Sequence, residues 1–326
     1  MENTLYASLV MALLCTACQN EAETELQQEK EYTVSIMARI GKPVSDARYV
    51  QQAEDIESAA DFATDDKIGV YMDDNDEAVC WTYSGISWTT EKTLYWEDKE
   101  SEHTFYAYYP YSEIGSTGID KVKMPSLSKQ DGSWENIPKY DFLVASKKLS
   151  YNDAAGVVSF TDNNAFKHVS SLLKIGIKAE GNMKEANIRQ ITLEKDGLTD
   201  QSYYSFDTEC VTFNGNTENT LRIDLDHFMN NQDVFYYFIL NGKGREDAAT
   251  NNPIVLTIQY TLNDKSYIAR HDELCPDLQS GCIYEYNLKI NDDKIIIEGG
   301  SISGWTPGND LEEIIIKGEE VEPTNQ

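Results

Sequence analysis

The sequence has little positive charge. Of its 326 residues only 27 are Lys or Arg, against 56 Asp or Glu, and the formal net charge at pH 7 is −29. A surface this acidic repels the phosphates of nucleic acids and the headgroups of anionic lipids. Nucleic acid is therefore not expected as a partner, and the charge argues against direct binding to an anionic membrane surface.

Long apolar runs are scarce as well. Beyond residue 18 no stretch approaches the roughly 20 residues that a membrane-spanning helix needs. The one apolar run near the start, Leu9–Cys18, ends in small residues and a cysteine, and Gln-Asn-Glu-Ala-Glu follows it. This order is typical of a secretory signal that is cleaved before the cysteine, although Glu2 stands where such a signal normally carries a basic residue.

The first 30 residues are therefore predicted to direct export. We expect a signal peptide over residues 1–17, lipid attachment at Cys18, and a flexible acidic tether over residues 18–30. With a lipid on Cys18, the rest of the chain would contact a membrane only through that anchor. Two alternatives remain open at this point, an ordinary cleaved signal and a misassigned start codon.

Motifs that mark enzymes and metal sites are missing. Four histidines are present, and none lies in an HExxH or another metal-binding spacing. The sequence contains no G-x-S-x-G, no P-loop and no glycine-rich dinucleotide turn. The acidic run Asp73–Asp76 lacks the central Gly and the closing Glu of an EF-hand loop. We therefore expect a protein that is not an enzyme and that needs no cofactor or metal.

Cysteines are few, and none has zinc-binding spacing. Four of them follow Cys18, namely Cys80, Cys210, Cys275 and Cys282. Cys275 and Cys282 flank a Pro-Asp-Leu-Gln-Ser-Gly turn. Either they form a disulfide across that turn, or they are buried thiols.

What the sequence does have is segments in which side chains alternate between two faces. Glu31–Ile40 places five apolar side chains on one face, which predicts a half-buried strand; these are Tyr32, Val34, Ile36, Ala38 and Ile40. A strand is also predicted over His103–Tyr109, with Phe105, Ala107 and Tyr109 on one face and Tyr106 and Tyr108 on the other. Val234–Leu240 is apolar on both faces, which predicts an interior strand. No helical period is sustained in the mature chain. The predicted fold class is all-β, with two tandem antiparallel Greek-key β-sandwiches over residues 31–164 and 165–326.

Aromatic side chains gather in the first half of the chain. Six of them fall within or beside short predicted strands and turns, namely Trp81, Tyr83, Trp88, Tyr95, Trp96 and Trp134. Exposed aromatic rings can stack on sugars, whereas alternating aromatics in strands usually form core and cross-strand pairs. A surface lipoprotein that binds glycans is therefore kept as an alternative function.

An ordered set of segments resembles one known family. The set comprises Phe62, Lys67–Tyr71, Leu94–Trp96, His103–Tyr111, Asp141–Ala145, Phe166–His168, Gly281–Asn287 and Ile302–Trp305. In this order and spacing these segments resemble the fimbrillin-like lipoproteins of Bacteroides and its relatives. The resemblance implies two transthyretin-like β-sandwich domains, export as a lipoprotein to the outer membrane and cell surface, and assembly into fimbriae that support adhesion.

The same resemblance implies how subunits assemble. In the family a trypsin-like protease removes the first strand, and a strand from another fimbrial subunit takes its place. Here the removable strand would be Tyr32–Ile40, and the candidate cleavage points are Arg48, Arg39 and Lys42. The donor would be the C-terminal segment that contains Leu311, Ile314, Ile315 and Ile316, unless that segment is simply the last strand of its own domain. A host or glycan receptor is a further implied partner.

Overall fold

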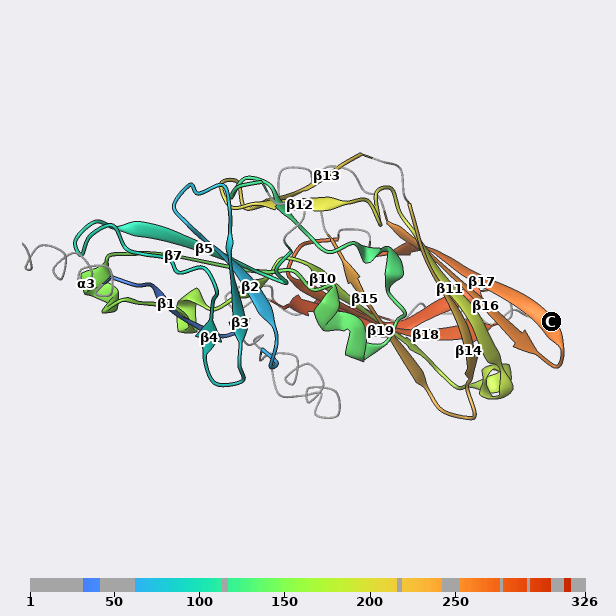
Figure 1. Ribbon diagram of the computed structural model, residues 1–326. Helices are drawn as coiled ribbons and strands as arrows, with labels where there is room; N and C mark the ends of the chain where they lie inside the picture. Colours follow the sequence, from blue (N-terminus) through green and yellow to red (C-terminus); the bar gives the residue numbers. More distant parts are fainter. Residues whose placement is uncertain are drawn as a thin grey trace, which may run out of the picture.

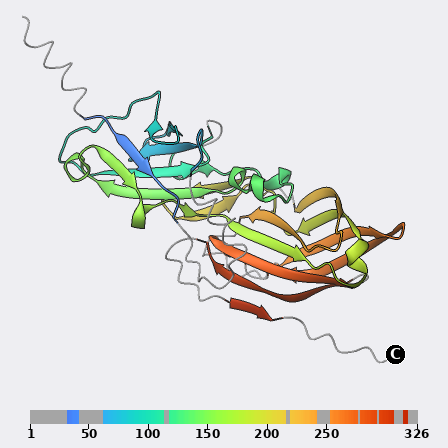
Figure 2. The same cartoon turned by 90° about the horizontal axis from the view of Figure 1, so that it is seen from below.

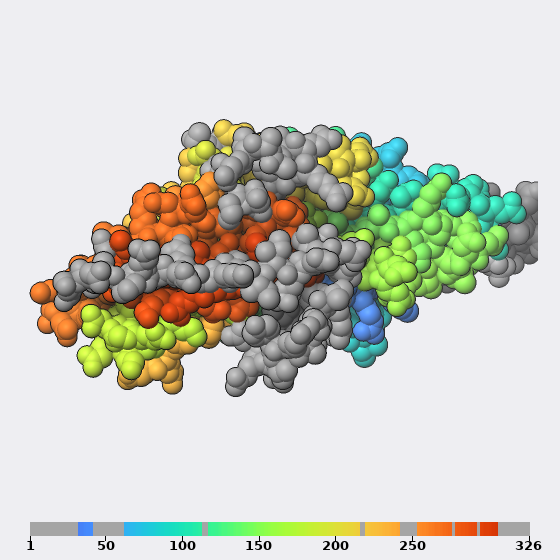
Figure 3. Space-filling model, turned by 180° about the vertical axis from the view of Figure 1, so that it is seen from behind, coloured from blue at the N-terminus to red at the C-terminus, as the bar shows by residue number. Residues whose placement is uncertain are grey.

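The protein consists almost wholly of β-strands arranged in two lobes along one axis (Figures 1 and 3). The computed structural model describes residues 32–41, 62–112, 117–215, 219–241, 253–275, 278–291, 294–305 and, for the backbone only, 314–317. Short helices connect some of the strands: η1 (Leu127–Lys129), η2 (Trp134–Lys139), α3 (Tyr151–Ala154), η3 (Asp162–Asn164) and η4 (Gly181–Glu185). The predicted all-β class is confirmed.

The first lobe is built on a sheet of six strands in the order β4-β3-β2-β5-β7-β9. Their bounds are β2 (Lys67–Met72), β3 (Val79–Tyr83), β4 (Trp88–Thr89), β5 (His103–Tyr109), β7 (Leu143–Leu149) and β9 (Lys167–His168). Neighbouring strands in this sheet are antiparallel. The alternation predicted for β5 is confirmed, because Phe105 and Ala107 enter the core on one face while Tyr108 enters a separate core on the other.

Each face of this sheet is covered by a different layer. One layer is the parallel pair β1 (Ser35–Ala38) and β8 (Val157–Phe160). The other is the three-stranded sheet β13-β12-β6, which joins β6 (Val122–Lys123) to β12 (Ser202–Ser205) and β13 (Cys210–Phe213). The β12–β13 hairpin comes from the second half of the chain and lies over the first lobe (Figure 1). One core of the first lobe is therefore completed by residues more than 30 positions beyond its last sheet strand, β9.

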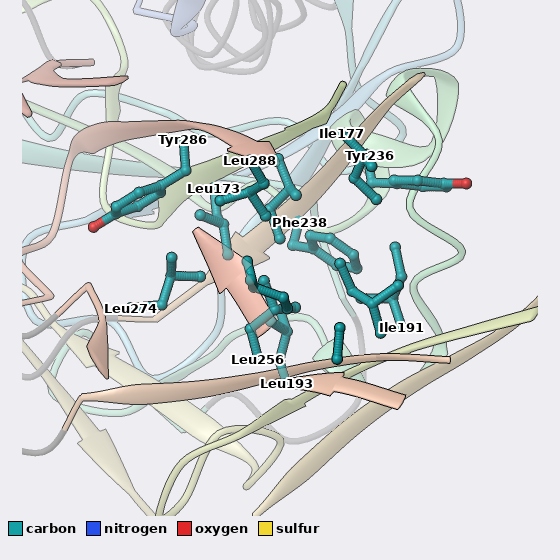
Figure 4. Close-up of a cluster of buried hydrophobic side chains, with 14 of the residues drawn as sticks. Leu173, Ile177, Ile191, Leu193, Tyr236, Phe238, Leu256, Leu274, Tyr286 and Leu288 are labelled. Carbon is teal, nitrogen blue, oxygen red and sulfur yellow. The ribbon is translucent and has the colours of Figure 1, made fainter. Parts of the chain in front are cut away.

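The second lobe is one sheet that curls around a single core. Its strand order is β14-β11-β16-β17-β19-β18-β10-β15, with β20 beside β19. The bounds are β10 (Ser171–Ile177), β11 (Asn187–Glu194), β14 (Thr220–Phe228), β15 (Val234–Leu240), β16 (Ile254–Leu262), β17 (Lys265–Leu274), β18 (Cys282–Asn291), β19 (Lys294–Gly304) and β20 (Ile314–Lys317). Side chains from both halves of this order, such as Leu193 of β11 and Leu288 of β18, meet in the core (Figure 4).

Strand β15 lies at the end of the sheet order and is not an interior strand, so that prediction was wrong. Its outer face is nonetheless partly covered. Leu127 and Ile137, from the η1–η2 segment of the first half of the chain, pack with Ile239 of β15. The apolar residues on both faces of β15 are thus explained by burial on both faces. On the outer face, the residues that bury them come from the η1–η2 segment.

Candidate functional site

Strand β1 lies between two other segments of the first lobe. On one side the Val34 amide donates to the Leu94 carbonyl (2.9 Å), and the Trp96 amide donates to the Tyr32 carbonyl (2.8 Å). On the other side β1 is parallel to β8, with registers from Ser35 opposite Val157 to Ala38 opposite Phe160. Figure 2 shows β1 as the blue strand of this lobe. The first strand is thus an inner member of its layer, paired along both edges.

The two faces of β1 differ completely in burial. Its inward side chains all belong to the core of the first lobe, and they are Val34, Ile36, Ala38 and Ile40. The outward side chains are exposed, and Met37 retains 54% of its accessible surface. Each fully buried aliphatic side chain of Val or Ile size contributes about 1.5–3 kcal/mol to folding. The burial predicted for these four positions is confirmed.

Tyr32, the fifth residue of the predicted apolar face, closes one end of this layer. Its ring meets the Tyr151 ring edge to face at 5.5 Å, and the Lys99 ammonium lies 4.7 Å from the Tyr32 ring centre. Tyr151 begins helix α3, whose N-terminus is capped by Ser150 and Asp153 bonding to each other's backbone. Hydrogen bonds from Ser150 lower the pKa of the Asp153 carboxyl. The end of β1 therefore rests against a well-capped helical turn.

Among the candidate cleavage points, Arg39 is held within the ladder. Its amide donates to the Phe160 carbonyl (3.0 Å), and its carbonyl accepts from the Phe166 amide (3.0 Å). A residue whose N–H and C=O are both hydrogen-bonded is not available to a protease until the strand opens. The other two candidates, Lys42 and Arg48, lie outside the described residues, as do Cys18 and Leu311.

The C-terminal segment is placed at the edge of the second lobe. Strand β20 pairs antiparallel with β19, from Ile302 opposite Ile314 to Gly299 opposite Lys317. Three predicted donor positions, Ile314, Ile315 and Ile316, thus lie in a four-residue strand at a sheet edge (Figure 2). The structure does not bring this segment to β1 of the same chain; the two belong to different lobes.

The chain enters that segment from a fixed point between the lobes. Trp305 is buried, and its ring stacks on His168 at 3.9 Å with an interplanar angle of 11°. His168 Nδ1 in turn lies 2.7 Å from a carboxylate oxygen of Asp141. The stack on Trp305 had no signal in the sequence, because 137 positions separate the two residues.

The clustered tryptophans do not form a surface. Trp81, Trp88 and Trp96 are buried in the core of the first lobe, so the exposed aromatic cluster that a glycan platform requires is not present there. Of the six aromatics considered, Tyr95 is the exposed one at 51%. These three tryptophans therefore give no support to the alternative of an aromatic platform, and they form core pairs, as alternating aromatics in strands usually do.

No group of three or more His, Cys, Asp or Glu side chains in the described ranges could hold a metal ion. His103 instead forms a close pair with Asp73, with Nδ1 and carboxylate oxygen 2.6 Å apart. No helix among the described residues is both long and apolar enough to cross a membrane.

Cys275 and Cys282 are free thiols within the second lobe. Both are buried, and burial raises the pKa of Cys275 to about 12 and that of Cys282 to about 11. The choice that the sequence left open is thus resolved in favour of buried thiols.

These two thiols are expected to resist alkylation in the folded protein. Because their pKa values are raised, the reactive thiolate is scarce at pH 8, and burial blocks access as well. Cys210, which is partly exposed, serves as the internal control. Mass spectrometry after iodoacetamide treatment should find Cys210 modified first, and Cys275 and Cys282 modified only after unfolding. Early modification of Cys275 would contradict the burial described here.

Three comparisons relate this architecture to known proteins. A model of the fimbrillin-like family matches residues 55–305. Among solved structures, a protein from Bacteroides uniformis ATCC 8492 assigned to cell adhesion has a TM-score of 0.56 at 17% identity, covering 84% of this chain and 99% of that one. A fimbrial protein from Bacteroides vulgatus ATCC 8482 has a TM-score of 0.53 at 14% identity, covering 84% and 100%. A search of curated proteins finds no match. At these identities the structural matches establish a shared fold.

Proposed function

Because the chain belongs to the fimbrillin-like family, we propose that it is a structural subunit of cell-surface fimbriae that assembles by strand exchange. The precursor would be exported as a lipoprotein, with the lipid on Cys18 holding it at the outer membrane. A trypsin-like protease would then remove β1, and a strand from a neighbouring subunit would replace it. Neither catalysis nor a cofactor is part of this proposal.

The observation that carries the proposal is the position of β1. It is an inner strand, yet it lies close to the start of the chain and its pairing is with short segments only. Removing it would unpair the backbone edges of Leu94–Trp96 and β8 and uncover the core beneath Ile36. An apolar groove with two unpaired edges is the kind of site that strand addition fills.

The donor in this proposal is the segment Asp310–Lys317 of another subunit. Its four-residue strand β20 lies at a sheet edge, where it can detach without opening the core of its own lobe. Trp305 would stay fixed on His168 while the segment beyond it extends outward. Strand residues advance about 3.3 Å each, so the segment's end at Lys317 would reach roughly 40 Å from Trp305.

Cleavage at Arg48 is favoured over cleavage at Arg39 in this proposal. The N–H and C=O of Arg39 are both hydrogen-bonded just beyond β1, and cutting there would leave Ile40 in the groove. Arg48 follows the whole of β1, so a cut after it would release the complete strand together with the lipidated Cys18. The lipid would then deliver the subunit to the surface without anchoring the mature form.

The test is to treat the lipid-free precursor with an Arg-specific protease. We expect a product that begins at Tyr49 by N-terminal sequencing, together with a ladder of oligomers in native gels. Arg48→Ala should remain uncut at this site and monomeric, whereas the matched variant Arg39→Ala should behave as the wild type. A precursor that is cut at Arg48 and still stays monomeric would contradict strand exchange, and cutting at Arg39 would contradict the assigned cleavage point.

A further inference from the structure

Strand β15 has a composition that is hazardous at the edge of a sheet. It reads Val-Phe-Tyr-Tyr-Phe-Ile-Leu, with no charge, proline or glycine. One of its edges pairs with β10, and among the described residues no strand pairs with the other. Apolar edge strands without charged residues are templates for pairing with another chain. An edge of this kind needs protection from outside the strand.

Protection comes from a segment of the first half of the chain, Leu127–Gly132. The Tyr237 amide donates to the Gly132 carbonyl (2.9 Å), and the Ile239 amide donates to Gln130 Oε1 (2.6 Å). Gln130 Nε2 donates back to the Ile239 carbonyl (2.8 Å). Tyr237 and Ile239 are two positions apart, as are successive outward-facing backbone groups of a strand. The segment therefore occupies the place where a neighbouring strand would bind.

Gln130 pairs with Ile239 through its side-chain carboxamide, which takes the place of the backbone peptide group of a neighbouring strand. Its carboxamide offers one acceptor and a donor in the same spacing as a peptide group, and the side chain is 5% exposed. Glu at this position would keep the acceptor and lose the donor, and Leu would lose both. The edge is thus held by a residue whose chemistry no apolar or acidic side chain reproduces.

The neighbouring Gly132 places the segment across the open side of the sandwich. A Cβ there would lie 2.9 Å from the Ile223 side chain of β14 and 3.2 Å from the Tyr236 ring of β15. These are the first and last strands of the sheet order. Gly132 also has a φ of +78°, which other residues rarely adopt. Nearby, the Trp134 ring packs on Tyr237 with ring centres 5.1 Å apart.

We propose that the edge of β15 is a second pairing surface, complementary to the β15 edge of a second copy, and that Leu127–Gly132 keeps it closed within each chain. The partner is a second copy because two identical uncharged edges can pair antiparallel about a two-fold axis. By covering this edge, Leu127–Gly132 prevents subunits from pairing through β15 and leaves the proposed strand exchange as their way of assembling. This inference does not depend on removal of β1, since it concerns the other lobe.

The test is Gln130→Leu in the uncut precursor. We expect the Ile239 amide to exchange about tenfold faster or more, because both hydrogen bonds between Gln130 and Ile239 are lost, and we expect concentration-dependent dimers in sedimentation experiments. Gln130→Glu should give a weaker effect of the same kind. The matched control is Gln201→Leu. This change removes the hydrogen bonds that Gln201 Nε2 donates to the Met124 and Ser202 carbonyls, and it leaves β15 untouched. The variant should stay monomeric.

A second variant separates edge pairing from general loosening of the protein. Phe235 lies on β15 with 37% of its surface exposed. Adding Phe235→Glu to Gln130→Leu gives β15 of each copy a charged side chain, which opposes strand pairing, so the dimer should disappear while the fast amide exchange persists. A Gln130→Leu protein that remains monomeric, or a dimer that survives Phe235→Glu, would overturn the proposal.

Discussion

A subunit truncated after Trp305 is expected to be cut by the Arg-specific protease and yet to form no polymers. Truncation removes the proposed donor, Asp310–Lys317, while the acceptor groove under β1 stays intact. The second lobe loses only the short edge strand β20, whose pairing is confined to residues 299–302 of β19. Assembly should therefore fall below detection by electron microscopy, whereas the precursor should remain a folded monomer.

The control for this experiment is a variant from which fewer C-terminal residues are removed. Ending the chain after Lys317 removes the acidic tail but keeps all of the proposed donor, so polymers should still form. Mixing the Trp305-truncated subunit with intact subunits should stop growth at one end, since it can accept a strand but cannot donate one. Polymers formed by the Trp305-truncated subunit alone would show that β20 is only the last strand of its own lobe.

Ile36→Ala is expected to destabilise the precursor strongly and the assembled polymer hardly at all. Ile36 is buried in the core of the first lobe, and large-to-small changes of this kind cost about 2–5 kcal/mol. Once β1 has been exchanged for a donor strand, residue 36 is no longer part of the subunit. Denaturant unfolding of the precursor and dissociation of the polymer measure the two halves of this prediction.

Met37→Ala is the matched control, because Met37 is the next residue on β1 and points outward. It should change the unfolding free energy by less than about 0.5 kcal/mol. If Ile36→Ala weakened the purified polymer as much as the precursor, β1 would still be in place after assembly, and the proposal would fail.

The sequence predicted the parts of this fold that depend on local alternation. The inward face of β1 and the two faces of β5 followed from period-two patterns. Local pattern could not assign partners. Nothing in Val157–Phe160 indicates a parallel partner for β1, because register and direction are set by the tertiary arrangement. The same limit explains why β15 was predicted as an interior strand.

The candidate site was predicted in part for a similar reason. Tyr32–Ile40 was identified as a strand from its own residues, whereas the proposal that it is removed came from the family resemblance. Gln130, by contrast, bonds Ile239, which lies 109 positions away. Trp305 stacks on His168, which lies 137 positions away. A single polar residue in a turn-rich segment looks the same in a sequence whether it is exposed or completes a distant sheet edge.

The β12–β13 hairpin has a consequence for the order in which the chain can fold. Tyr108 and Phe142 of the first lobe share their core with Tyr204 and Val211 of that hairpin. A chain threading through a membrane from its N-terminus delivers the hairpin only after all six strands of the first sheet have emerged. One apolar face of the first sheet therefore stays uncovered until roughly 40 further residues have emerged. Residues 31–164 expressed alone would lack strand β9 and the β12–β13 hairpin, so we expect that face to stay uncovered in such a fragment.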